Sequence, residues 1–254
     1  MATAINVQSA CTEIEWKTRQ RLAACYRIFA HFGWDELIYN HITLKVPDED
    51  NAFLINPYGL HFSEVTASTL VKIDIDGNTL DGSKFPVNKA GFVQHSLFHR
   101  EKPEIHAIAH THTTATMAVC SYDGGLLPIN FYAAMLTRRL AYHDFQGITV
   151  RADEGPDFLK SLGSKRIMML KNHGPVVMAK TIEQCFQDHW ALQRACEIQI
   201  ETLSMGDPVL ISDEVVDRHM AHLHEAQIDP TAVGAPEFDA MVRLIDQKDT
   251  SWRE

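Results

Sequence analysis

Several kinds of segment are missing from this 254-residue sequence, and each absence excludes a class of protein. No run of lysine and arginine makes a stripe that could follow a phosphate backbone, and the formal net charge is −10, so we expect no nucleic-acid partner. No stretch approaches the roughly 20 apolar residues that a membrane-spanning helix needs. The first residues, MATAINVQSACTEIEWK, lack the basic and apolar regions of a secretory signal. We therefore expect a soluble cytoplasmic protein with no membrane partner.

Cysteine patterns typical of structural metal sites are also missing. The five cysteines are odd in number, and no two of them have CxxC spacing. Cys25, Cys185 and Cys196 fall in apolar segments with a helical pattern, so we expect buried free thiols in a reducing compartment. The length and the 45% hydrophobic content fit one large domain, or one domain with a short extension.

Helical and strand-like patterns are present throughout the chain. Helices are predicted over residues 13–32, 88–100, 113–120, 155–162, 182–205, 213–224 and 236–246. Strands are predicted over 41–46, 52–57, 71–76, 104–112, 166–170 and 176–179, with two short strand-like runs within 139–150. Thr12 and Thr181 each begin a capping box in front of a helix. Hairpins imply antiparallel neighbours, so we predict an α/β fold with helices on both faces of a mostly antiparallel or mixed sheet.

Three histidines are candidates for a metal site. His110 and His112 are spaced i, i+2 at the end of a predicted strand, so their side chains point to the same face. A packed or hydrogen-bonded pair is the alternative, because the chain has 14 histidines. His173 stands in KNHG at a turn after another strand, where a plain turn residue is the alternative. Three ligands would leave a position for water or substrate, and imidazole suits zinc, iron, cobalt and manganese alike.

Longer blocks around these histidines carry a family resemblance. They include YNHITLKVP, INPYGLHFSEVTASTLVKIDIDG, AGFVQHSLFHREKPEIHAIAHTHTTATMAVCS and RIMMLKNHGPVVMAKTIEQCFQ. Over residues 12–206 the sequence resembles the class II aldolase/adducin family, which leaves 207–254 as a C-terminal helical extension packed on the same domain or on a neighbouring subunit.

The resemblance has consequences for fold, cofactor and assembly. It implies a three-layer α/β/α sandwich with a mostly antiparallel central sheet. It also implies a divalent metal, usually zinc, on His110, His112 and His173, with iron, manganese and cobalt as alternatives. Relatives are commonly homotetramers whose active sites lie between subunits, so we expect a homo-oligomer.

One position departs from the sugar-phosphate aldolases of this family. They carry a glutamate upstream of the HxH motif that moves protons and binds the metal, and the resemblance places Gly91 there. The serines that hold the substrate phosphate are replaced by residues such as Lys89 and Ala90. The sequence is more similar to the adducin-like branch, which also reads AGF at this point. A three-histidine site without the carboxylate favours a bidentate anionic substrate, such as a 2-oxo or 2-hydroxy carboxylate.

The resemblance also assigns residues around the metal. Asn40 and Thr43, and Tyr58, Gly59 and His61, resemble loops that line the substrate pocket, with solvated turns as the alternative. Tyr132 resembles the region that supplies a catalytic tyrosine from a neighbouring subunit, where a phenol could donate a proton. Lys89 could bind a substrate carboxylate or face solvent.

Three functions remain open from the sequence. The first is a metal-dependent lyase, by aldol cleavage or decarboxylation of a small hydroxy- or oxo-acid. The second is a non-catalytic, adducin-like binding module. The third is a non-haem iron oxygenase.

Overall fold

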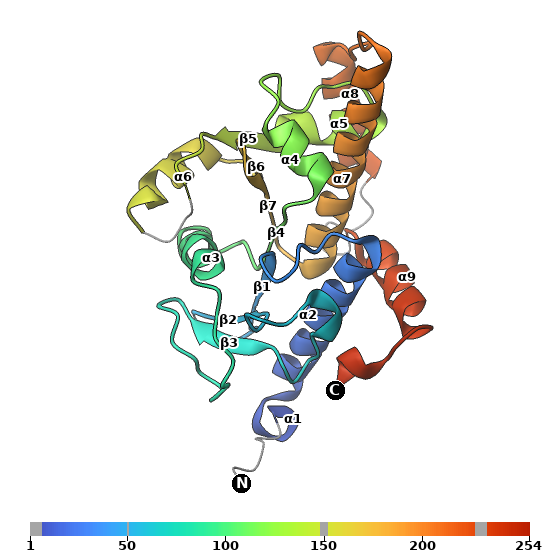
Figure 1. Ribbon diagram of the computed structural model, residues 1–254. Helices are drawn as coiled ribbons and strands as arrows, with labels where there is room; N and C mark the ends of the chain where they lie inside the picture. The colour runs from blue at the N-terminus through green and yellow to red at the C-terminus, as the bar shows by residue number, and fades with distance from the viewer. Residues whose placement is uncertain (1–6, 50, 148–151, 227–232) are drawn as a thin grey trace.

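A single mixed sheet organises the part of the chain that the computed structural model describes, residues 7–49, 51–147, 152–226 and 233–254 (Figure 1). Its strands are β1 His41–Lys45, β2 Ala52–Ile55, β3 Val71–Asp74, β4 Ala107–His110, β5 Leu140–His143, β6 Ile167–Leu170 and β7 Gly174–Ala179. Their order is β3-β2-β1-β4-β7-β6-β5, and every neighbouring pair is antiparallel except β5 and β6. The predicted α/β class with a mostly antiparallel sheet is confirmed.

Helices cover both faces of this sheet (Figure 1). Their bounds are α1 Val7–Ala10, α2 Glu13–Phe32, α3 Lys89–Glu101, α4 Thr114–Cys120, α5 Phe131–Leu136, α6 Gly155–Leu162, α7 Ile182–Met205, α8 Asp213–Ala226 and α9 Ala235–Asp246. Helices α3 and α6 lie on one face, and α2, α4 and α7 lie on the other. Among the described residues, none of the helices combines the length and apolar character that a membrane crossing requires.

The strands place alternate residues in two separate cores. In β4, Ala107 and Ala109 face the core under α2 and α7, whereas Ile108 packs with Phe98 of α3 and Phe158 of α6. Because side chains alternate along a strand, His110 points to the same face as Ile108. The central strand is therefore apolar on both sides and ends in a histidine on the α3 face.

The predicted helix signals act largely as expected. Thr12 Oγ1 accepts a hydrogen bond from the amide of Glu15 at 3.1 Å, and α2 ends at Gly33 with a φ of 70°. Thr181 caps α7 in the same way, at 3.1 Å from the amide of Gln184. Burial of Cys25, Cys185 and Cys196 as free thiols inside these two helices is also confirmed.

Some features differ from the predictions, and one prediction falls outside the described residues. The strand predicted over 104–112 is only Ala107–His110, so His112 lies beyond its end. Helix α5 was not predicted, although Asn130 caps it by accepting from the amide of Ala133 at 2.9 Å. The second strand-like run near Gly147 extends into 148–151, outside the described residues.

The C-terminal segment packs on the same chain. Helix α9 packs against α2 and α7, and its Phe238 is fully buried with the ring centroid 5.7 Å from that of Phe186. Helix α8 packs against α5. The division of the chain into 12–206 and an extension over 207–254 stays a prediction.

Candidate metal centre

Three imidazole groups meet at the end of the central strands. The antiparallel pairing of β4 with β7 sets His110 opposite Val176, which brings the turn carrying His173 beside the end of β4. Nε2 of His112 lies 2.8 Å from Nε2 of His110 and 3.0 Å from Nε2 of His173. One ligand atom from each histidine lies within 4.8 Å of the others. The chain thus brings together the three histidines that the sequence singled out.

His110 and His112 are both held in the tautomer that carries the proton on Nδ1 and leaves Nε2 free to bind a cation. Nδ1 of His110 lies 2.8 Å from the carbonyl oxygen of Pro175, which can only accept, so Nδ1 carries the proton. Nδ1 of His112 likewise lies 3.1 Å from a carboxylate oxygen of Glu36. When neutral, both rings then direct Nε2 lone pairs at one point, an arrangement that suits a metal ion with oriented histidine ligands. The donor set fits a divalent metal.

The surroundings keep the three rings neutral. Burial holds the pKa of His110 well below its usual range, and the neighbouring His112 lowers it further. Burial also lowers the pKa of His112, and lowers that of His173 to about 4 with a contribution from His112. Neutral imidazole is the form that binds metals, so the lone pairs are available near neutral pH.

The turn that carries His173 is fixed by close packing. Asn172 has a φ of 59°, in the left-handed region that asparagine tolerates better than most residues. A Cβ built on Gly174 would lie 2.4 Å from the backbone oxygen of Thr111, so only glycine fits there. The residues on either side of His173 are therefore suited to a turn that packs closely against the end of β4.

A cavity of about 480 Å³ opens in front of the three rings. Its other lining residues are Glu36, Tyr39, His41, Tyr58, Asn88, Gln94, Met117 and Asn172. Among the described residues that line it, Glu36 is the one carboxylate. The sequence did not single out Glu36, His41 or Gln94 as site residues, although His41 lies inside the YNHIT block on which the resemblance rests.

The predicted pocket residues are placed differently from one another. Tyr58 lines the cavity, and Gly59 follows it with a φ of 105°. Asn40 is buried and donates from Nδ2 to the carbonyl of Trp34 at 3.0 Å. Thr43 is fully buried, with Oγ1 at 2.8 Å from ring nitrogens of His95 and His99. His61 caps a 3₁₀ turn and pairs with Asp35 at 2.7 Å.

The two residues predicted for catalysis do not line the cavity of their own chain. Lys89 is exposed at the first position of α3. Tyr132 of α5 packs against Trp190, with ring centroids 5.3 Å apart. A role for either residue would therefore require movement of its side chain or a neighbouring subunit.

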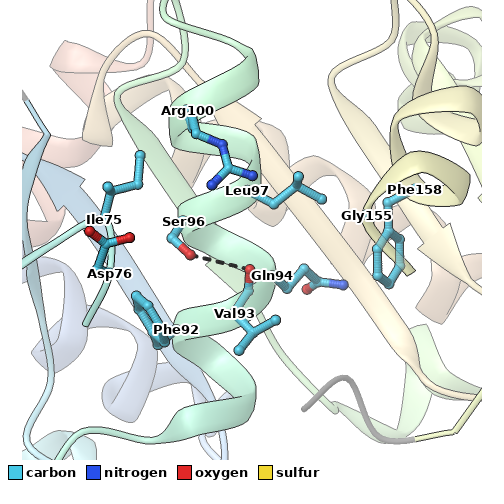
Figure 2. Close-up of a pocket in the computed structure, with 10 residues that line it drawn as sticks. All are labelled: Ile75, Asp76, Phe92, Val93, Gln94, Ser96, Leu97, Arg100, Gly155 and Phe158. Carbon is cyan, nitrogen blue, oxygen red and sulfur yellow. Dashed lines mark hydrogen bonds between the residues drawn. The ribbon is translucent and has the colours of Figure 1, made fainter. Parts of the chain in front are cut away.

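A second cavity of about 250 Å³ lies along α3 (Figure 2). It is formed between α3, α6 and the turn after β3, with Phe92, Arg100, Phe158 and Asp76 in its lining. Gln94 lines both cavities, and its amide extends from α3 toward Phe158. Its Nε2 is buried and has no hydrogen-bond partner within the described chain. Gln94 therefore belongs to both cavity linings and has an amide donor that no described residue uses.

The fold is that of a known family. The chain belongs to the class II aldolase and adducin N-terminal domain family, whose model matches residues 20–200. The predicted resemblance is confirmed.

Individual relatives cover both branches of the family. A crystal structure of an aldolase II superfamily protein from Pseudomonas syringae superposes with a TM-score of 0.90 and 36% identity, over 97% of this chain and 99% of that one. An L-fuculose 1-phosphate aldolase from Glaciozyma antarctica gives a TM-score of 0.81 and 25% identity, over 100% of this chain and 97% of that one. Alpha-adducin of Rattus norvegicus is 40% identical over 90% of this chain, which covers 33% of adducin.

Proposed function

We propose that this protein is a metal-dependent lyase that acts on a small hydroxy- or oxo-acid by aldol cleavage or decarboxylation. The main support is the convergence of three imidazole ligand atoms within 4.8 Å, at the wall of a cavity of about 480 Å³. A cavity of this size suits a small molecule. Three protein ligands leave a coordination position for the substrate, as in catalytic metal sites.

The chain's own residues would hold and orient the reactants. His110, His112 and His173 would bind the ion, and Pro175 and Glu36 hold the first two rings in orientation. A bound divalent ion, zinc by expectation with iron, manganese and cobalt as alternatives, would act as a Lewis acid toward a substrate oxygen. Tyr58, Gln94 and Asn172 offer polar groups to the rest of the substrate.

The charge of the cavity supports an anionic substrate. The described part of its lining has one carboxylate, Glu36, which lies beside His112. Position 91 on α3 offers no side chain. A divalent ion in this lining would leave excess positive charge, which favours a carboxylate that offers two oxygen atoms.

We also propose that the working unit is a homotetramer. Tyr132 would then reach the cavity of a neighbouring subunit as a proton donor, and Lys89 would bind a substrate carboxylate. The exposed Phe131 beside Tyr132 offers an apolar contact for such a neighbour. Light scattering measures the assembly, and Tyr132→Phe should lower turnover without loss of metal.

Metal analysis of the purified chain tests the lyase proposal. We expect one divalent ion per chain, lost in His173→Ala but kept in His106→Ala, which removes an exposed histidine near β4. Turnover of 2-oxo and 2-hydroxy acids should be lost with the metal. Metal-free wild-type protein from a metal-replete culture would exclude this function. Iron with substrate-dependent oxygen uptake would instead identify an oxygenase.

The 40% identity to alpha-adducin supports a second candidate, a binding module without turnover. In that case the metal would be absent or purely structural, and a specific protein partner would co-purify. A panel of small acids would then neither bind nor react. Saturable binding of one such acid to the metal-loaded chain would decide against the binding module.

A further inference from the structure

The space beside Gly91, where a larger residue would place its side chain, is occupied by the imidazole of His41. Gly91 is buried in α3, and a Cβ built there would lie 2.3 Å from Cδ2 and 2.7 Å from Nε2 of His41. Real side chains do not approach so closely, so no larger residue fits while His41 keeps its place. Glycine is thus required here by the space that His41 occupies.

His41 is held rigidly beside the candidate metal centre. It is the first residue of β1 and lies opposite His110 in the antiparallel pairing of β1 with β4. Their ring centroids are 5.1 Å apart, and His41 lines the same cavity. The ring of His95 packs edge-on against the ring of His41, with the centroids 4.5 Å apart. His95 is itself held by a hydrogen bond between its Nδ1 and Oγ1 of Thr43. Helix α3 and strands β1 and β4 therefore determine where this imidazole sits.

One ring nitrogen of His41 has no partner among the residues that the structure describes. The side chain is 4% exposed, and its Nδ1 has no hydrogen-bond partner among the described residues. A buried polar atom without a partner is costly, and such atoms in native proteins usually meet a water or a ligand. His41 lines the cavity that it shares with the three histidines, which offers space for such a ligand.

We propose that His41 is a substrate-contact residue that makes the site selective for small dianionic acids. Its imidazole hydrogen-bonds the acid held at the three-histidine centre, and in neither protonation state does it add negative charge. A carboxylate in the same place would repel an anionic ligand. This inference rests on the metal site proposed above.

Oxalate is a suitable probe because it is a small dianion with two chelating oxygen atoms. Calorimetry on the zinc-loaded full chain compares wild type, His41→Ala, His41→Asn and the double variant His41→Ala/Gly91→Glu. We expect His41→Ala to bind oxalate about tenfold more weakly, the loss typical of one hydrogen bond. The amide of His41→Asn should restore affinity to within about threefold of wild type. In the double variant, the new carboxylate should weaken binding about 100-fold.

Zinc content is measured on the same samples. If wild type binds no zinc, the proposed function fails. If wild type and His41→Ala both hold one zinc and bind oxalate equally, only the role of His41 is overturned. Should His41→Ala not fold, a crystal structure of the wild-type chain with zinc and oxalate decides the matter. An oxalate oxygen within about 3.2 Å of a His41 ring nitrogen supports the contact, and a ring turned away from oxalate refutes it.

Discussion

Nδ1 of His112 lies 3.1 Å from a carboxylate oxygen of Glu36, and this contact orients the only candidate ligand that stands outside a strand or turn. Glu36 precedes β1, whereas His112 follows β4, so the contact joins segments far apart in sequence. The carboxylate both fixes the ring and increases the basicity of Nε2. Glu36 therefore has a defined part in the candidate centre, although it would not touch the ion.

Removal of this carboxylate should weaken metal binding. Partners of this kind are typically worth 10- to 100-fold in affinity, and Glu36 is 46% exposed, so we expect about a tenfold loss in Glu36→Ala. Competition with a chromogenic chelator measures the zinc affinity. Glu104→Ala, an exposed glutamate near β4, is the matched control and should be neutral. Equal zinc affinity in Glu36→Ala and the control would show that the contact is incidental.

The turn that carries His173 provides a second prediction. In Gly174→Ala the new Cβ would start 2.4 Å from the backbone oxygen of Thr111, which cannot move without shifting the end of β4. We expect a loss of about 1–3 kcal/mol in the free energy of unfolding, together with weaker zinc binding. Urea denaturation and chelator competition measure the two effects.

The control for this variant is Gly155→Ala at the start of α6. There the nearest atom to a new Cβ is the flexible end of Leu97 at 3.3 Å, so the change should be nearly neutral. If Gly174→Ala behaves like Gly155→Ala, the close packing of the turn is not what positions His173.

Local sequence patterns predicted most of the elements and the three histidines. The ends of α2 and α7 follow from Thr12, Gly33 and Thr181, because capping depends on neighbouring residues alone. The unpredicted α5 had such a signal in Asn130. Strand β4 is shorter than predicted, and the flanking residues 104–106 and 111–112 that lie outside it are mostly polar.

The contacts that complete the site could not be predicted in this way. His41 and Gly91 meet across 50 positions of sequence, and the contact depends on how α3 lies over β1. Glu36 and His112 are likewise joined only by the fold. A sequence pattern identifies residues suited to bind metal, but it contains no information on which distant side chain will stand beside them.

Acid should destabilise the fold through its buried histidines. Burial lowers the pKa of His99 to about 3, against about 6.5 for an exposed histidine. Between these two values the unfolded chain binds a proton that the folded chain does not, so stability falls as the pH falls from about 6.5 toward 3. Each such group contributes about 1.4 kcal/mol per pH unit to the slope.

The variant His99→Gln tests this prediction. Glutamine can keep hydrogen bonds to Thr43 and to the carbonyl of Ile105, but it does not titrate. The free energy of unfolding, measured in urea at pH 4.5 to 6.5, should have a slope lower by about one proton than in wild type. His222→Gln, on the exposed side of α8, is the control for the substitution itself. A wild-type slope in His99→Gln would mean that His99 takes up its proton in the folded state.

Because His41 packs against Gly91, the change Gly91→Ala should affect the free energy of unfolding in opposite directions in the wild-type chain and in His41→Ala. Inside a helix, alanine is normally more stable than glycine by about 1 kcal/mol. In this chain Gly91→Ala should instead be destabilising by about 1–3 kcal/mol, because the new methyl group would overlap the ring of His41. In a His41→Ala background that overlap is absent, so the same Gly91→Ala change should become neutral or stabilising. Urea denaturation of the four proteins gives the coupling energy directly. If Gly91→Ala has the same effect in both backgrounds, then His41 does not occupy the space beside position 91, and its assignment to the site fails with it.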